Sequence, residues 1–178
     1  AVARTILNFG INELRVVGRD GNWSDEARNR AKHAQQILDN CAHFDSIKQA
    51  VEDCSVVIGT SGKREIGDKI SFRHFVTPEE IPKRLQGVEG KVAFVFGPED
   101  IGLTNEQLHE CDLLLTIPTW EGYPILNLSH AVSIICYSWY SNISDKHSIE
   151  RQESRLLDPE LRRILRSEIN RLVENMST

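Results

Sequence analysis

The sequence predicts an α/β fold in which a parallel β-sheet is flanked by helices. Short apolar runs such as Val56–Ile58 and Val92–Phe96 alternate along the chain with helical patterns, and short loops join them. Strands that are apolar on both faces are typical of a parallel sheet covered on both sides. The chain has 178 residues, 40% hydrophobic and 26% charged, which suits one ordinary globular domain.

The first third of the chain combines helix-capping residues with apolar residues at helical or strand spacing. Ser24 is a typical N-cap, and Asp25 and Glu26 behind it favour the positive end of a helix dipole. The expected elements are a helix over 1–9 ended by Gly10, a strand over 14–17, a helix from Ser24 to Leu38, a short helix from Asp45 to Val51, and a strand over 56–58.

The second third repeats this alternation. Thr77 with Glu80, and Thr104 with Gln107, have the spacing of capping boxes, and Pro78 suits a first helical position. The expected elements are a helix over 77–85, a strand over 92–96, a helix from 104, a strand over 113–117 and a long helix over 128–139.

Two regions are expected: one domain over 1–141, then a linker and a C-terminal amphipathic helix over 142–178. Asp158-Pro159-Glu160 begins that helix. Its apolar stripe must be buried against the parent domain or a partner subunit, and we expect it to be associated with a dimer. The stripe consists of Leu161, Ile164, Leu165, Ile169, Leu172 and Val173.

Composition excludes some classes of protein. No apolar run approaches the roughly 20 residues that span a bilayer, and no signal peptide opens the chain, so we expect a cytoplasmic protein without membrane contact. The net charge of −5 argues mildly against nonspecific nucleic-acid coating, although a local basic patch can still bind RNA. The four cysteines lack metal-ligand spacing, so we expect buried thiols and no metal.

Unusual residues follow three of the expected strands. Ligands of parallel α/β sheets bind at the carboxyl ends of strands, where this chain has Gly59–Lys63, Gly97–Leu103 and Pro118–Asn127. Each segment alone is compatible with an ordinary turn, but the three together favour a ligand site. None matches a dinucleotide or Walker loop, which argues against those cofactors and leaves another nucleotide-binding enzyme as a weak alternative.

These segments carry a family resemblance. Ala-x-x-Arg-x-x-x-Asn-Phe-Gly at 1–10, Phe-Gly-Pro-Glu-Asp-x-Gly-Leu-Thr at 96–104, and Ile-Pro-Thr at 117–119 with Tyr-Pro-x-Leu-Asn-Leu-Ser-His-Ala-Val at 123–132 resemble three motifs. They are those of the SpoU–TrmH class of SPOUT methyltransferases. The likeness runs in order over about residues 1–140.

The resemblance implies a deep trefoil knot near the C-terminal half, a homodimer, and transfer of a methyl group from S-adenosylmethionine to a ribose 2′-hydroxyl. The implied substrate is tRNA, at an anticodon-loop nucleotide, with rRNA as the alternative. The implied catalytic residues are Arg4, Glu99 and Asn127. The implied cofactor-binding residues are Thr60, Ser61, Gly62, Gly97, Ile117, Pro124, Ile125 and Leu126.

Two departures from the family pattern bear on activity. Ile125 stands where the family usually has Ser before Leu-Asn, and an alkyl side chain cannot orient a substrate by hydrogen bonding. The strand and the Asn-x-Gly that normally precede the first helix are absent, so we expect the first strand of the domain to be missing. Ile125 and the acidic charge leave open a noncatalytic, RNA-binding dimeric scaffold.

RNA-contacting residues are less well specified. Arg4 is suited to grip a phosphate and to stabilise an alkoxide, because its guanidinium stays protonated. Trp120 and Tyr123 either pack locally or stack on bases. The first basic candidates are Lys63, Arg64, Lys69 and Arg73, for which a solvated charged loop is the alternative interpretation. The second are Arg155, Arg162, Arg163 and Arg166, for which the polar face of a dimer helix is the favoured interpretation.

Overall fold

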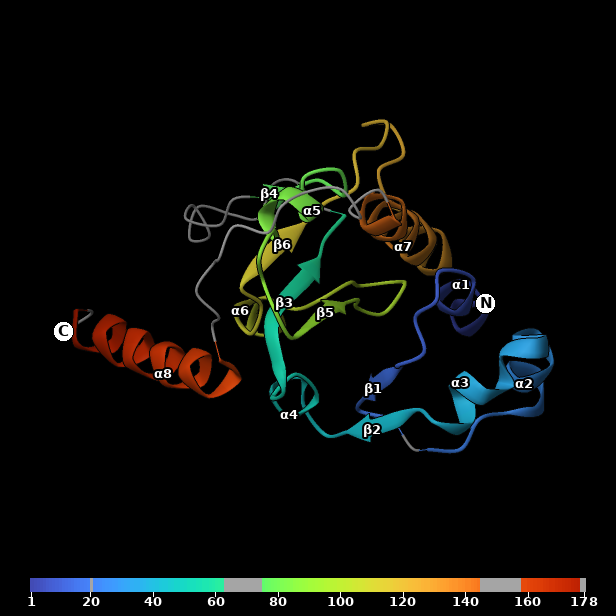
Figure 1. Ribbon diagram of the computed structural model, residues 1–178, viewed down its shortest axis with the longest axis horizontal. Helices are drawn as coiled ribbons and strands as arrows, with labels where there is room; N and C mark the ends of the chain where they lie inside the picture. The colour runs from blue at the N-terminus through green and yellow to red at the C-terminus, as the bar shows by residue number, and fades with distance from the viewer. Residues whose placement is uncertain (20, 63–74, 145–157, 177–178) are drawn as a thin grey trace.

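The computed structural model describes residues 1–19, 21–62, 75–144 and 158–176 as an α/β fold with two parallel sheets (Figure 1). Its elements in chain order are α1 (Val2–Asn8), β1 (Arg15–Val17), α2 (Asp25–Ala31), η1 (Lys32–Ala34), α3 (Gln35–Asp39), β2 (Ala42–Phe44), α4 (Ile47–Ala50), β3 (Cys54–Thr60), β4 (Phe75–Val76), α5 (Ile81–Arg84), β5 (Lys91–Val95), α6 (Asn105–His109), β6 (Leu113–Leu115), α7 (Leu128–Ser144) and α8 (Pro159–Met176).

The larger sheet has the strand order β4-β6-β3-β5, and β1 pairs with β2 in the smaller one. Every described strand pair is parallel, which confirms the fold class predicted from the apolar runs. Strand β3 is central: Ile58 lies opposite Phe94 of β5 on one side and Leu113 of β6 on the other. The carboxyl ends of β3, β5 and β6 therefore meet at one edge of the sheet.

The alternation of side chains along β3 divides the core into two layers. Val57 packs with Ile47 and Leu108, which α4 and α6 supply, and it is fully buried. Ile58 is also fully buried but packs on the opposite face with Ile81 of α5 and Ile135 of α7. Successive residues of a strand point to opposite faces, so a strand apolar at every position needs helices on both sides.

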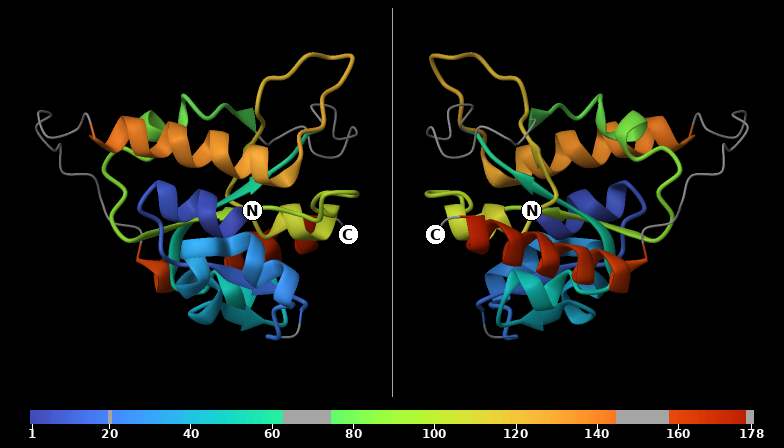
Figure 2. Two further views of the ribbon diagram at one scale, coloured as in Figure 1. Left: turned by 90° about the vertical axis from the view of Figure 1, so that its right-hand side faces the viewer. Right: turned by 90° about the vertical axis from the view of Figure 1, so that its left-hand side faces the viewer.

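A third cluster of apolar side chains joins α1 to α7. Ala3 and Ile6 of α1 are buried against Val132 and Cys136 of α7, together with the α2–α3 segment. Figure 2 shows the two helices lying side by side. Gly10, at φ +71°, follows the end of α1, where the chain adopts a left-handed conformation that costs glycine little.

The segment between α1 and β3 differs most from the prediction. The helix expected to continue from Ser24 to Leu38 is interrupted at Lys32, which has a φ of 51°, and a short 3₁₀ turn follows. Strand β2 was not predicted at all. The N-cap of α4 is Ser46 rather than Asp45, with its hydroxyl accepting from the amide of Gln49 at 3.3 Å.

The two predicted capping boxes differ in outcome. Thr104 and Gln107 exchange both hydrogen bonds at the start of α6, as expected. At the other, the Thr77 amide donates to the Glu80 carboxylate at 2.8 Å, but the helix begins only at Ile81.

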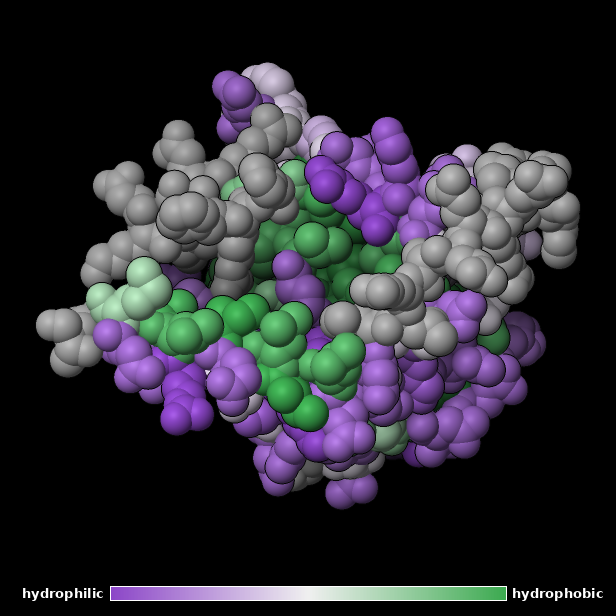
Figure 3. Space-filling model, turned by 60° about the vertical axis from the view of Figure 1, so that its left-hand side comes forward, coloured by the Kyte–Doolittle hydropathy of each residue, from purple (hydrophilic) through white to green (hydrophobic). Residues whose placement is uncertain are grey.

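Helix α8 is attached by its arginine face, and its apolar stripe faces outward. Arg162 donates to the carbonyl of Cys54 at 3.2 Å, and Arg166 donates to the carbonyls of His109, Glu110 and Cys111 at the end of α6. Cations are favoured there because a helix C-terminus carries partial negative charge. The expectation that the parent domain might bury the stripe is wrong, because these apolar side chains are exposed and form the row of green in Figure 3.

Three of the cysteines behave as predicted. Cys54, Cys111 and Cys136 are buried, whereas Cys41 is only partly buried. Burial among apolar side chains raises the pKa of Cys136 to about 11. Among the described residues, no helix is long and apolar enough to cross a membrane.

Candidate active site at the carboxyl ends of the strands

The three segments singled out in the sequence line one pocket of about 610 Å³ at the carboxyl edge of β3, β5 and β6. Pockets of this size and position typically hold a small ligand. The structure places all eight residues expected to contact a cofactor on its wall: Thr60, Ser61, Gly62, Gly97, Ile117, Pro124, Ile125 and Leu126.

The end of β3 is held in place from both sides. The Thr60 hydroxyl donates to the carbonyl of Val95 on β5 at 3.0 Å, and the Ser61 amide donates to the carbonyl of Leu115 on β6 at 3.0 Å. The Thr60 side chain is therefore already engaged within the fold. The three strand ends keep fixed positions relative to one another, as a preformed binding site requires.

The loop after β5 folds back tightly on itself. The Gly102 amide donates to the carbonyl of Pro98 at 2.8 Å, and Gly102 has a φ of 70°. A Cβ atom on Gly97 would overlap the backbone of Gly102 and Leu103, so only glycine fits where the loop crosses its own start. The wall of the pocket here is mainly backbone, which can approach a ligand closely.

The loop after β6 forms the opposite wall. The Thr119 hydroxyl donates to the carbonyl of Pro124 at 3.0 Å and closes the base of this loop. The Ile125 side chain lies against Gly62, where an added Cβ would come within 2.9 Å of its terminal methyl. Ile125, the departure from the family pattern, thus packs against the end of β3 and brings no hydroxyl to the pocket.

Glu99 and Asn127, two of the three predicted catalytic residues, are hydrogen-bonded to each other. The Asn127 side-chain amide donates to the Glu99 carboxylate. Its carbonyl oxygen accepts from the amide of Ser129 at 2.9 Å and from the Ser129 hydroxyl at 2.7 Å, so it caps the first turn of α7. Asn127 therefore fixes the Glu99 carboxylate, which lines the pocket, against the start of α7.

The third predicted catalytic residue lies apart from this pair. Arg4 is exposed on α1, whose buried face carries Ala3 and Ile6, and it is not among the residues that line the pocket. One chain, as described, thus brings together Glu99 and Asn127 but not Arg4.

Sequence reasoning missed the contribution of helix sides to the pocket. Leu108 of α6 and Leu128 and Ala131 of α7 also line it. Their helical spacing is indistinguishable from that of core residues, since each faces the sheet as a buried position would. Only the tertiary arrangement reveals that they flank an opening.

The predicted RNA-binding cations divide into two groups. Lys63, Arg64, Lys69, Arg73 and Arg155 lie outside the described residues. The arginines of α8 are engaged within the chain: Arg162 and Arg166 attach the helix, and Arg163 pairs with Glu52 at 2.9 Å. These contacts within the chain occupy the α8 arginines, and whether the helix belongs to a dimer stays a prediction.

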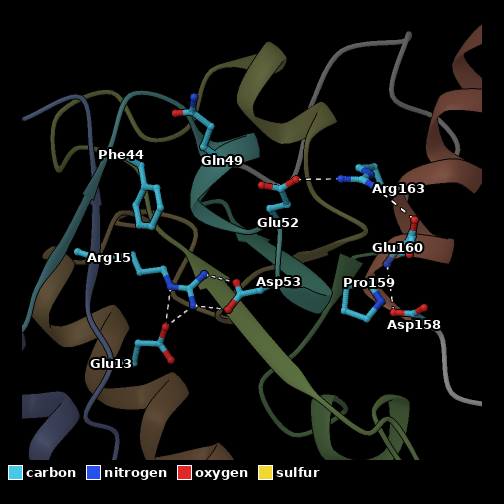
Figure 4. Close-up of a pocket in the computed structure, with 11 residues that line it drawn as sticks. Glu13, Arg15, Phe44, Gln49, Glu52, Asp53, Asp158, Pro159, Glu160 and Arg163 are labelled. Atoms are coloured by element: carbon cyan, nitrogen blue, oxygen red, sulfur yellow. Dashed lines mark hydrogen bonds and ion pairs between the residues drawn. The ribbon is translucent and has the colours of Figure 1, made fainter.

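A second pocket of about 680 Å³ lies near the start of α8, lined by residues of β1, β2 and α4 among others. Figure 4 shows the Arg15 guanidinium between the carboxylates of Glu13 and Asp53. The guanidinium lowers the pKa of both carboxyls below their usual range. Lys91 pairs with the same two carboxylates, so two cations balance two anions, and no residue of the three motifs lines this pocket. Among the described residues, no cluster of His, Cys, Asp and Glu could hold a metal ion.

Comparison with known proteins agrees with this geometry. The model of the SpoU rRNA Methylase family matches residues 1–137. This stretch includes the described strands β1 to β6 and all residues that line the pocket at the carboxyl ends of the strands. The chain belongs to the SpoU methylase family. The resemblance predicted from the three motifs is thereby confirmed.

Relatives within the SpoU family include named enzymes. The chain is 45% identical over 141 residues, 79% of its length, to the tRNA (cytidine-2′-O-)-methyltransferase TrmJ of Methanocaldococcus jannaschii, of which it covers 61%. It also resembles the structure of a probable methylase family protein from Haemophilus influenzae, with a TM-score of 0.75 and 33% identity, covering 85% of this chain and 64% of the other.

A second solved structure, TrmJ from Z. mobilis, matches with a TM-score of 0.70 and 31% identity, covering 78% of this chain and 61% of that one. The chain thus spans a little under two thirds of the length of these relatives.

Proposed function

We propose that this chain is the catalytic part of an S-adenosylmethionine-dependent methyltransferase that modifies a ribose 2′-hydroxyl of tRNA, at a nucleotide of the anticodon loop. The observation that carries the proposal is the convergence of the second and third family motifs, together with the end of β3, on one pocket. The tRNA substrate is favoured over rRNA by the relatives named TrmJ, at 45% and 31% identity.

The residues of the pocket suit such a cofactor. Gly62 and Gly97 both line the pocket without a side chain, so backbone amides and carbonyls there can approach the polar groups of a nucleoside and an amino acid. Ile117 and Leu126 offer apolar surface to an adenine ring. When bound, the cofactor supplies a methyl group activated by positively charged sulfur.

The chain's own contribution is positioning and electrostatics. In the transfer, the ribose oxygen forms a bond to the methyl carbon while the carbon–sulfur bond breaks, and the hydroxyl proton is released. Glu99, fixed by Asn127, presents a carboxylate at the pocket wall that can accept the hydrogen bond of the incoming hydroxyl. Alignment of this kind lowers the barrier without a covalent intermediate.

We further propose that the enzyme is a homodimer and that Arg4 acts across the subunit interface. Two observations support this: Arg4 is exposed outside its own chain's pocket, and the neighbouring surface of α7 is apolar. There Tyr137 is 62% exposed and its ring lies 6.2 Å from that of Phe9 on α1. Contiguous exposed aromatic surface is typical of an interface.

The remaining family features are proposals as well. They are a deep trefoil knot near the C-terminal half of the domain and RNA contacts by the basic residues Lys63, Arg64 and Arg73, which lie outside the described residues. A cytoplasmic location follows from a tRNA substrate.

Cofactor binding and methyl transfer test the proposal directly. Titration with S-adenosylmethionine should give saturable binding, and unmodified tRNA with labelled cofactor should acquire one 2′-O-methyl group that can be mapped to its nucleotide. Absence of cofactor binding up to millimolar concentration would overturn the proposal. Cofactor and RNA binding without transfer would instead favour the noncatalytic scaffold suggested by Ile125.

Mixed dimers test the placement of Arg4. Arg4→Ala and Glu99→Ala should each abolish transfer while leaving cofactor affinity nearly unchanged. If Arg4 serves the partner's pocket, an equimolar mixture of the two inactive variants should recover about a quarter of wild-type activity, because half of the dimers are then mixed and each has one intact site of two. No recovery, despite subunit exchange, would place Arg4 in its own chain's site.

A further inference from the structure

The loop between β6 and α7 carries two aromatic side chains that the fold leaves uncovered. Trp120 and Tyr123 are each 79% exposed, although buried aromatic area is among the largest apolar contributions a side chain can make. Figure 2 shows this loop projecting beyond the body of the domain. Most of both side chains is therefore available to a partner at the surface.

The loop holds the two rings in defined positions. The Tyr123 amide donates to the carbonyl of Trp120 at 3.0 Å, which closes a four-residue turn with an aromatic residue at each end. The distal end of the Trp120 indole lies next to Gly122, where a Cβ atom would overlap it. Gly122 thus leaves room for the indole, and most of the side chain is open to solvent.

The turn is joined directly to the candidate active site. Pro124, Ile125 and Leu126 follow it in sequence and line the pocket, and the Thr119–Pro124 hydrogen bond holds the base of the loop. Across the pocket, Ile101 of the opposite loop is also largely exposed. The pocket therefore has an exposed apolar side chain on one side and adjoins the aromatic turn on the other.

The chemistry of the loop identifies its partner. Residues 117–127 contain no Lys or Arg and one acidic residue, Glu121, so the loop offers no positive charge to a phosphate backbone. Exposed aromatic faces without cations suit the unstacked bases of single-stranded RNA, which stack on Trp and Tyr. We infer that Trp120 and Tyr123 form a stacking platform for nucleobases of the RNA loop whose ribose enters the pocket.

This inference rests on the proposed function, and its test separates the two. The probe is an unmodified tRNA transcript, with a single-stranded RNA decamer and its duplex for comparison. Trp120→Ala should weaken binding of the transcript and the decamer about tenfold (about 1.4 kcal/mol) and raise the KM for tRNA. Trp120→Phe should restore most of the affinity, and cofactor affinity should stay unchanged in both. The duplex, whose bases are already stacked, should bind alike to wild type and variants.

A direct spectroscopic readout is available because the other tryptophans are engaged. The Trp23 indole donates to the carbonyl of Leu38, and the Trp139 ring packs on Phe94. A stacked base quenches indole fluorescence, so the decamer should quench wild type and leave Trp120→Phe nearly unaffected. Glu121→Ala, in the same turn, is the matched control and should bind RNA at least as well as wild type.

Three results would overturn the platform. The first is that Trp120→Ala binds RNA as tightly as wild type. The second is that the decamer quenches the fluorescence of Trp120→Phe as much as that of wild type. The third is that Trp120→Ala changes the oligomeric state, which would make the loop a protein interface. The wild-type protein could fail to bind S-adenosylmethionine and fail to methylate tRNA, yet still bind single-stranded RNA through Trp120. In that case the proposed function fails and the stacking platform stands.

Discussion

Single glycines decide the shape of the candidate cofactor pocket. Gly62 and Gly97 both lie on its wall, but they differ in what surrounds them. At Gly97 an added Cβ meets backbone atoms of Gly102 and Leu103, which cannot move without opening the loop. At Gly62 it meets only the flexible end of the Ile125 side chain.

We therefore predict that Gly97→Ala is much more damaging than Gly62→Ala. Gly97→Ala should cost on the order of 1–3 kcal/mol of unfolding free energy, as overpacking does, and should abolish cofactor binding. Chemical denaturation and calorimetric titration measure the two effects.

Gly62→Ala provides the matched control, and a second substitution tests its cause. Gly62→Ala should lose less stability than Gly97→Ala. Adding Ile125→Val should relieve that loss, because valine lacks the terminal methyl group that the new Cβ would meet. A Gly97→Ala protein as stable and as competent in binding as wild type would contradict the assigned role of the backbone crossing.

Some features of the candidate site could be predicted from the sequence and others could not. The eight expected cofactor positions came from the family resemblance, and they share one pocket because the strand ends of a parallel sheet meet at one edge. The hydrogen bond between Asn127 and Glu99 joins loops 28 residues apart, and no local pattern encodes it. The displacement of Arg4 from the pocket likewise depends on how α1 packs, which only tertiary structure fixes.

Helix α8 shows how an amphipathic element can be attached by its polar side. Arg166 supplies hydrogen bonds to three carbonyls at the end of α6, and α6 in turn lines the pocket through Leu108. The apolar stripe of α8 takes no part in this attachment, since its side chains are about half exposed or more.

We predict that Arg166→Ala loosens α8 without unfolding the domain. Amide hydrogen exchange in α8 should accelerate by at least tenfold, because the carbonyls of α6 lose their cationic partner, whereas exchange in α7 should not change. Arg171→Ala, on the exposed part of the same helix, is the control. Equal protection of α8 in wild type and Arg166→Ala would refute the attachment.

Element boundaries were predictable where capping chemistry decides them and not where packing does. Thr104 and Gln107 specify the start of α6 locally, and the structure has that box intact. The break at Lys32 has no local signal, since Ala31 and Ala34 both follow the apolar spacing and both are buried. Strand β2 is three residues with one exposed side chain, too short for a periodic pattern.

At the scale of the whole molecule, one group of charges connects the two sheets. Arg15 of β1 pairs with Glu13 and Asp53, and Lys91 at the start of β5 pairs with Asp53 at 2.8 Å. The cations lower the pKa of both carboxyls, Asp53 more than Glu13.

The sign of the pH dependence follows from these shifts. A carboxyl with a lowered pKa in the folded state stabilises the fold fully above its unfolded pKa of about 4, and that contribution is lost as the pH falls further. We predict that the unfolding free energy declines between pH 5 and pH 2.5, and that Asp53→Asn shows a smaller decline than wild type.

Solvent exposure of these carboxyls keeps the effect modest. Urea denaturation at each pH measures it, with Asp45→Asn as a control for the loss of one negative charge. An unchanged pH profile in Asp53→Asn would exclude the cluster as a source of acid sensitivity.

The buried thiols give the native chain its own reporter of conformational opening. Cys136 lies where α1 packs against α7, and burial raises its pKa to about 11, so it reacts with an alkylating reagent only when that contact opens. Partly buried Cys41 should label first and Cys136 much later. The order in which the cysteines are modified, read by mass spectrometry, would therefore give a time-resolved record of which layer of the protein separates first.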